Sequence, residues 1–312
     1  MTRVGVVDLG TNSTRLLVAD VEDSSVSELD RRLEITRLGE GVDARGQLLP
    51  QAIARVRNVL VDYRRTIEEL GAERTLAFAT SAVRDAENGE AFLGEVEWSY
   101  GFATRLLSGH EEALLTFRGV AAGRDLTDGT LVVDVGGGST ELILGGPDGV
   151  SFHESFDLGC VRLSERFPSD PDGAAASVRA VLDRELPGDL EGRSAIGVAG
   201  TVTQLATLDL GLEREEPELV HGHRMSAETI ATQVKQLAAM PVEEIRRLRG
   251  MHPERAPVIV AGAVVVREVL SHFGLAELEV SERDIMHGAA LAAAALPEPV
   301  EGDAPPGAFT CC

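Results

Sequence analysis

Two glycine-rich loops, each introduced by an aspartate at the end of a short apolar run, constrain the fold of this chain more than any other feature. The first loop reads Asp8-Leu9-Gly10-Thr11-Asn12-Ser13, and the second reads Asp134-Val135-Gly136-Gly137-Gly138-Ser139. A further apolar run follows each loop, which predicts a strand, a tight turn and a second strand in both places. The two aspartates are 126 residues apart (134 minus 8). The sequence therefore predicts a duplicated domain.

The residue types in these loops suit the binding of phosphate. Glycine lets the backbone turn tightly and lets successive amides approach one anion. An aspartate beside such a turn can hold a divalent cation that bridges to phosphate oxygens. Neither loop has the lysine that a Walker-type phosphate loop requires, which excludes that class of ATPase. The two loops together predict a phosphate site in a cleft between the copies.

The charge of the chain restricts its partners. A formal net charge of −22 argues against nucleic acid and acidic membrane surfaces, and no apolar run reaches membrane-spanning length. Lys235 is the single lysine, so almost all positive charge is arginine, which grips phosphate bidentately. A polyanionic substrate must therefore be met by local arginines and bound cations. We expect a cytoplasmic protein of two domains, and we leave open whether it forms a homodimer.

Apolar periodicity predicts the same order of elements twice. In the first copy we expect strands at 3–9, 14–21, 26–37, 75–80 and 102–107, and helices at 50–70, 88–100 and 109–121. In the second we expect strands at 130–135, 139–145, 149–158, 194–199 and 276–281, helices at 173–186 and 283–296, and a helical insertion over 201–272. This order is ribonuclease-H-like. The expected domains are 1–124 and 125–297.

The end of the chain, residues 298–312, contains prolines, glycines and acids without periodicity, which predicts a flexible tail. Two of the three cysteines, Cys311 and Cys312, lie there, and the third is Cys160. Their positions predict free thiols rather than a disulfide framework or a zinc site.

Four segments together resemble a known family. They are Asp8-Leu9-Gly10-Thr11-Asn12-Ser13-Thr14-Arg15, Ala79-Thr80-Ser81-Ala82-Val83-Arg84-Asp85-Ala86-Glu87-Asn88, Ser108-Gly109-His110-Glu111-Glu112-Ala113 and Asp134-Val135-Gly136-Gly137-Gly138-Ser139-Thr140-Glu141-Leu142. With them the chain resembles the exopolyphosphatase/guanosine pentaphosphate phosphatase (Ppx/GppA) family of the actin-like ATPase superfamily, in a short two-domain form. The resemblance implies an α/β fold of two ribonuclease-H-like domains with an interdomain cleft.

The resemblance also implies an activity, which is metal-dependent release of terminal orthophosphate from inorganic polyphosphate. The metal would be Mg²⁺ or Mn²⁺, and the short form favours short to medium chains. Guanosine pentaphosphate is the alternative substrate, but it needs a stacking surface for its purine, and the chain has few aromatic residues to build one. A phosphate or nucleotide sensor without catalysis is an alternative of another class.

Glu111 and Glu112 follow a predicted turn and begin a predicted helix. Acids at a helix start commonly complement the helix dipole. Glu112 matches the position of the family's general base, so we expect it to be catalytic. Glu111 is expected to cap the helix or to orient its neighbour.

Asp134 and Glu141 are seven residues apart across the glycine turn, which can bring both carboxylates to one side of a metal site. Alternatively, Asp134 caps the turn and Glu141 faces solvent. The resemblance implies phosphate contacts from Asn12, Ser13, Arg84, Gly136, Gly137, Gly138 and Ser139. Asp8, Thr11 and Arg15 are further candidates, although Asp8 can instead order its own loop. The loop at 197–203 predicts either an anion site or a tight turn from strand to helix.

Overall fold

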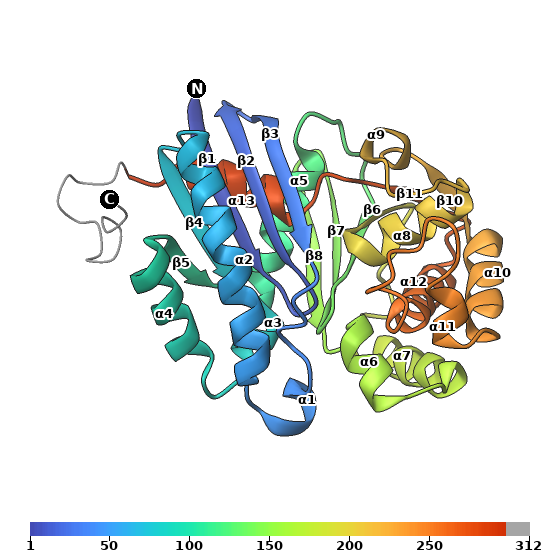
Figure 1. Cartoon of the computed structure of the whole chain (residues 1–312). Helices are drawn as coiled ribbons and strands as arrows, with labels where there is room; N and C mark the ends of the chain where they lie inside the picture. Colours follow the sequence, from blue (N-terminus) through green and yellow to red (C-terminus); the bar gives the residue numbers. More distant parts are fainter. Residues whose placement is uncertain (298–312) are drawn as a thin grey trace. The chain divides into compact units, whose positions relative to one another are not determined.

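The computed structural model of the protein describes residues 1–297 and divides the chain into two compact units (Figure 1). Unit 1 consists of Met1–Arg124 together with the residues from Ile285 onward, and unit 2 consists of Asp125–Asp284. Each unit is built on one mixed β-sheet. The tail predicted at 298–312, with Cys311 and Cys312, lies outside the described residues.

The sheet of unit 1 has five strands in the order β3-β2-β1-β4-β5. Their bounds are β1 Thr2–Leu9, β2 Thr14–Glu22, β3 Ser25–Glu34, β4 Arg74–Ala79 and β5 Ala103–Leu106. The first three strands are antiparallel, and β4 and β5 add to them in parallel. Side chains alternate between the faces of a strand, so Val4 and Val6 of β1 enter one apolar cluster while Val7 and Leu9 enter another.

Helices cover both faces of this sheet. Their bounds are α1 Val42–Arg45, α2 Pro50–Glu69, α3 Ser81–Arg84, α4 Gly89–Tyr100, α5 Gly109–Ala121 and α13 Ile285–Ala294. The apolar faces of α2 and α4 pack in the cluster that contains Val7. Helix α13 and Leu115 of α5 pack in the cluster that contains Val4. Figure 1 shows α2 (light blue) in front of the strands and α13 (red) behind them.

The last helix differs from the sequence-based assignment, which placed it in the second domain. In the structure α13 contacts β1, β2 and α5 and so belongs to unit 1. Its Ile285, Met286 and Ala289 are buried there. Gly288 permits this packing, because a Cβ atom at that position would lie 1.8 Å from the carbonyl oxygen of Leu115. Unit 2 begins at Asp125.

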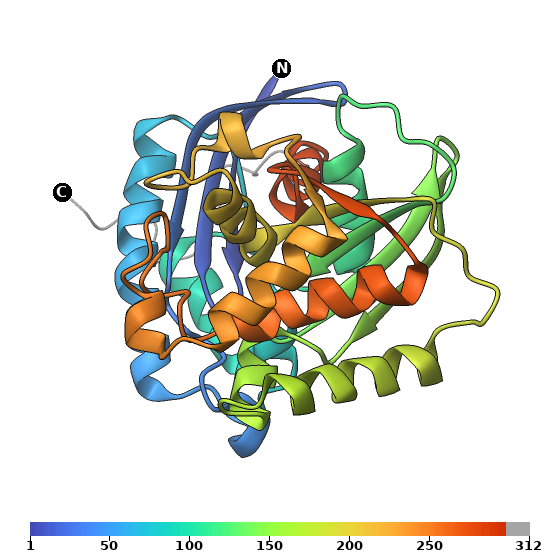
Figure 2. The same ribbon diagram turned by 90° about the vertical axis from the view of Figure 1, so that its right-hand side faces the viewer.

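The sheet of unit 2 has six strands in the order β10-β11-β9-β6-β7-β8. Their bounds are β6 Thr130–Val135, β7 Thr140–Gly146, β8 Gly149–Phe156, β9 Ser194–Val198, β10 Arg224–Ser226 and β11 Glu277–Val280. The helices are α6 Cys160–Arg166, α7 Pro171–Glu185, α8 Ala199–Asp209, α9 Pro217–Val220, α10 Ala227–Ala238, α11 Val242–Ile245 and α12 Ile259–Phe273. Figure 2 shows α12 between α7 and α10, and it contacts both.

Both units repeat three antiparallel strands followed by parallel strands with helical crossovers, which confirms the predicted α/β class. Periodicity missed only short elements, namely α1, α3, α6 and β10. Such elements contain too few residues to show a period. No helix within residues 1–297 combines the length and apolar composition needed to cross a bilayer.

Candidate active site

Each unit holds its glycine loop between the first two strands of its sheet, and each loop is preceded by an aspartate at the same register. In unit 1, Asp8 of β1 lies directly opposite Arg15 of β2. In unit 2, Asp134 of β6 lies directly opposite Glu141 of β7. Opposite residues of an antiparallel pair have their Cβ atoms about 4.5–5.5 Å apart on the same face. The duplicated hairpins therefore carry different charges at matching positions.

In unit 1 the aspartate is neutralised by its partner. The Oδ2 atom of Asp8 accepts hydrogen bonds from Nη2 of Arg15 at 2.6 Å and from Nε at 2.8 Å. Both side chains are largely buried. The amide of Gly10 donates to the carbonyl oxygen of Ser13 at 3.1 Å and closes the turn. This geometry favours the interpretation in which Asp8 orders its own loop.

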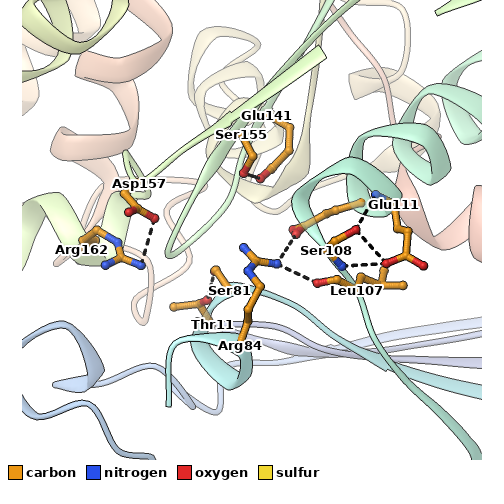
Figure 3. Close-up of polar contacts among 11 residues, drawn as sticks. Thr11, Ser81, Arg84, Leu107, Ser108, Glu111, Glu141, Ser155, Asp157 and Arg162 are labelled. Atoms are coloured by element: carbon orange, nitrogen blue, oxygen red, sulfur yellow. Dashed lines mark hydrogen bonds and ion pairs between the residues drawn. The ribbon is translucent and has the colours of Figure 1, made fainter. Parts of the chain in front are cut away.

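Backbone and hydroxyl contacts hold the first loop in place. The carbonyl oxygens of Thr11 and Asn12 accept hydrogen bonds from the amides of Gly39 and Arg37. The hydroxyls of Thr11 and Ser81 lie 3.0 Å apart and join the loop to the start of α3 (Figure 3). Thr11 is buried, whereas the predicted phosphate contacts Asn12 and Ser13 are partly exposed.

The structure brings Arg84 and Glu112 together. Arg84 ends α3, and its Nη1 donates to the carbonyl oxygen of Leu107 at 2.8 Å (Figure 3). The same Nη1 lies 3.4 Å from Oε2 of Glu112. Glu112 is only 8% exposed. The expected base and one expected phosphate contact therefore share one small region of unit 1, although 28 residues separate them in the chain.

Glu111 has a different role from its neighbour, because it forms a capping box with Ser108. The Ser108 hydroxyl accepts from the Glu111 amide, and Oε2 of Glu111 accepts from the Ser108 amide at 2.9 Å. The pKa of Glu111 lies below its usual value, mainly because of the hydrogen bond from the Ser108 backbone and then that from its hydroxyl. The side chain of Glu111 points toward Ser108 in Figure 3, as a cap requires.

In unit 2 three polar residues form a row across adjacent strands. Glu141 lies opposite Asp134 on one side and opposite Ser155 of β8 on the other. The carboxylates of Asp134 and Glu141 belong to buried residues, exposed by 7% and 1%. The Ser155 hydroxyl donates to Oε1 of Glu141 at 2.7 Å (Figure 3). Sequence reasoning missed Ser155, which only the strand register reveals.

These two carboxylates suit a hard divalent cation. Within residues 1–297 no group of three or more histidine, cysteine, aspartate or glutamate side chains is arranged to hold a metal. Magnesium usually keeps several waters and takes one or two protein carboxylates together with substrate phosphates. Asp134 and Glu141 fit that pattern, and they do not fit a closed zinc site.

The second glycine loop is closed by its own backbone and packs on the start of α6. The Gly136 amide donates to the Ser139 carbonyl oxygen at 3.0 Å, so this amide serves the turn itself. The Gly136 carbonyl oxygen accepts from the amide of Cys160 at 2.9 Å. Burial raises the pKa of the Cys160 thiol. Cys160 is a free thiol, as the sequence predicted.

The loop at 197–203 is a sharp junction between β9 and α8. Ala199 has a φ of 66°, in the left-handed region. The guanidinium of Arg255 packs against Gly200, where a Cβ atom would lie 1.7 Å from Nη1. The junction thus combines a tight turn with an arginine that the sequence did not single out. His223 contacts Asp209 at 2.7 Å, and His221 accepts from the Glu282 amide, which are structural roles.

Comparison with known proteins identifies the family. Residues 17–295 match the Ppx/GppA phosphatase family. Exopolyphosphatase 2 of Mycobacterium tuberculosis is 39% identical over 94% of this chain and 99% of its own length. Exopolyphosphatase 1 of the same species is 31% identical over 89% of this chain and 84% of its own length.

Two solved structures share the fold. The crystal structure of an exopolyphosphatase-like protein gives a TM-score of 0.86 at 33% identity and covers 93% of this chain and 98% of its own. The Ppx/GppA family member of Aquifex aeolicus gives 0.79 at 29% identity and covers 93% of this chain and 97% of its own. With the motifs in place on both sheets, the chain belongs to the Ppx/GppA phosphatase family.

Proposed function

We propose that this chain is an exopolyphosphatase that releases orthophosphate from the end of inorganic polyphosphate. The observation that carries the proposal is the buried Glu112 carboxylate beside the Arg84 guanidinium. Two relatives that match most of the chain are named exopolyphosphatases, which supports this substrate.

Hydrolysis of a phosphoanhydride needs a positioned water, a proton acceptor and neutralisation of charge. In the proposed reaction Glu112 accepts a proton as the water oxygen bonds to the terminal phosphorus. The bond from that phosphorus to the bridging oxygen breaks, and the shortened chain leaves as an anion. Glu112 then passes its proton to phosphate or water. Arg84 lies beside the base and binds oxygens of the terminal phosphoryl group.

A divalent cation would be held by Asp134 and Glu141. The family implies a divalent cation without specifying which one, and we propose Mg²⁺ or Mn²⁺ because both ligands are carboxylates. When bound, the cation neutralises charge on phosphate oxygens. This matters for a chain whose formal net charge is −22, because its overall field repels a polyanion.

Phosphate contacts are proposed from both glycine loops. Asn12 and Ser13 of the first loop are partly exposed and can donate hydrogen bonds. In the second loop the amides of Gly137, Gly138 and Ser139 are proposed to bind the phosphoryl group. Gly136 keeps a role in shaping the turn, because its amide donates to Ser139. Arg15 is paired with Asp8, so we propose that Arg15 orders the loop and does not contact the substrate.

The test compares phosphate release from short polyphosphate, long polyphosphate and guanosine pentaphosphate at equal metal and salt. We expect the highest kcat/KM for short to medium polyphosphate, and a rise in KM with salt because phosphate contacts are screened. A higher kcat/KM for guanosine pentaphosphate would reverse the ranking of the two substrates. If the protein binds phosphate but releases none from any of the three substrates, a non-catalytic sensor is favoured. The Glu112→Gln variant is the negative control for the rate of phosphate release.

A further inference from the structure

The carbonyl groups of the glycine triplet all face the segment that begins α6. The Gly136 oxygen accepts from the Cys160 amide at 2.9 Å. The Gly137 oxygen accepts from the Val161 amide at 2.8 Å. The Gly138 oxygen accepts from the Gly159 amide at 3.2 Å. Residues 159–161 therefore fix the orientation of three consecutive peptide groups.

This anchoring determines where the loop amides point. A trans peptide is planar, and its N–H points opposite to its C=O. Carbonyls held toward residues 159–161 therefore turn the N–H groups of Gly137, Gly138 and Ser139 away from that segment. Successive amides with a common direction form a concave anion site. The orientation of the carbonyls is thus a condition for phosphate binding by the amides.

Arg162 completes the anchoring from the side. Its Nε donates to the Gly138 oxygen at 2.8 Å, and its side chain is only 10% exposed. The other end of the guanidinium lies 3.5 Å from Asp157, which is 72% exposed (Figure 3). A hydrogen bond from a charged donor is stronger than one between neutral groups. The bond from Arg162 therefore holds the Gly138–Ser139 peptide more firmly than the longer bond from Gly159 does.

We propose that Arg162 is a positioning residue for the phosphate loop, which orients the Ser139 amide toward the terminal phosphoryl group through its bond to the Gly138 oxygen. This assignment rests on the proposed function, in which these amides bind phosphate. The proposal gives a role to an arginine that lies outside the four segments that resemble the family. In the sequence this arginine is found three residues after Gly159, in Gly159-Cys160-Val161-Arg162.

Three variants of Arg162 test the hydrogen bond and the charge. Arg162→Met keeps the length of the side chain but removes both its donors and its charge. Arg162→Lys keeps the charge and a donor but replaces the planar guanidinium with an ammonium group, and Arg162→Gln keeps N–H donors without the charge. Arg166→Met is the matched control, because Arg166 is an exposed arginine one turn later on α6. Asp157→Asn tests whether the exposed ion pair matters.

The first readout is binding of inorganic phosphate, followed by the amide NMR signals of Gly137, Gly138 and Ser139. We expect Arg162→Met to weaken phosphate binding at least about tenfold, as for loss of a charged hydrogen bond. Arg162→Lys, which keeps a charged donor without the planar fork, should show a smaller loss. Arg166→Met and Asp157→Asn should stay within about twofold of wild type. Arg162→Gln, which keeps an amide NH2 group with two donors, should show a smaller loss in the same assay, and it replaces Arg162→Met if that variant does not fold.

The second readout is the kinetics of polyphosphate hydrolysis. We expect kcat/KM to fall in parallel with phosphate affinity in the three Arg162 variants, at temperatures well below their unfolding midpoints. Phosphate affinity within twofold of wild type in Arg162→Met, or a loss in Arg162→Gln as large as that in Arg162→Met, would overturn the positioning role. Wild-type protein that releases no phosphate from polyphosphate would sink the proposed function, while the binding assay would still decide the role of Arg162.

Discussion

Asp134 faces Glu141 directly across β6 and β7, whereas the matching position opposite Asp8 holds Arg15. In unit 1 the arginine forms an ion pair with the aspartate. In unit 2 both members of the pair are carboxylates, and they are the proposed ligands of the divalent cation.

The first prediction concerns this pair of carboxylates. Asp134→Asn should raise the Mg²⁺ or Mn²⁺ concentration for half-maximal activity at least about tenfold, because it removes a charged ligand. Calorimetric metal titration and phosphate release measured against metal concentration check this effect. Asp148→Asn, in the exposed turn between β7 and β8, is the control. Full activity after exhaustive chelation would refute the requirement for a divalent cation.

The second prediction concerns Ser155, whose hydroxyl holds Oε1 of Glu141. Partners of metal ligands commonly change affinity by about 10–100-fold when they are removed. Ser155→Ala should therefore weaken Mn²⁺ binding within that range and leave phosphate affinity of the metal-free protein unchanged. Ser151→Ala on the same strand is the control, because the Ser151 hydroxyl donates to the Leu144 carbonyl oxygen instead. Equal metal affinity in the two variants would show that Ser155 does not support metal binding by Glu141.

The third prediction concerns the base. Glu112→Gln keeps the shape of the side chain but cannot accept the proton, so kcat should fall at least about a hundredfold. The melting temperature should change little, since the amide still fits beside Arg84. Glu111→Gln is the neighbouring control and should retain most of the turnover, because Glu111 contacts Ser108. Near-normal turnover of Glu112→Gln is the outcome that contradicts the assignment.

The fourth prediction concerns pH and the cap of α5. The pKa of Glu111 is lowered in the folded protein by its hydrogen bonds from Ser108. Such a group stabilises the fold above the pKa of the unfolded state, about 4.3, and loses this contribution as the pH falls through the folded value. Glu111→Gln should lower the free energy of unfolding at neutral pH by less than about 1 kcal/mol, because the site is exposed.

Denaturation curves between neutral pH and about pH 3 measure this effect. The difference between wild type and Glu111→Gln should shrink on the acid side. Ser108→Ala should cost about 1 kcal/mol at neutral pH, as for loss of an N-cap. A difference between wild type and Glu111→Gln that grows toward acid pH would show that the cap does not depend on the ionised carboxylate.

Features that depend on near neighbours in the chain could be predicted from the amino-acid sequence alone. Alternating apolar residues and glycine turns placed both hairpins, and a hairpin of known register brings Asp134 opposite Glu141. The acids that follow Ser108 indicated a helix start, and the capping box there is a local structure. Strand period, turn chemistry and capping act over a few residues, so they can be predicted without the fold.

Contacts between distant segments follow from the complete fold. The fold places Arg84 beside Glu112, brings Arg162 to the Gly138 carbonyl oxygen, and packs α13 on the sheet of unit 1. The sequence of α13 gives an apolar helix but does not say which sheet receives it. That choice depends on the fit of Gly288 against the Leu115 backbone, and close packing of this kind is fixed by the whole fold rather than by local periodicity.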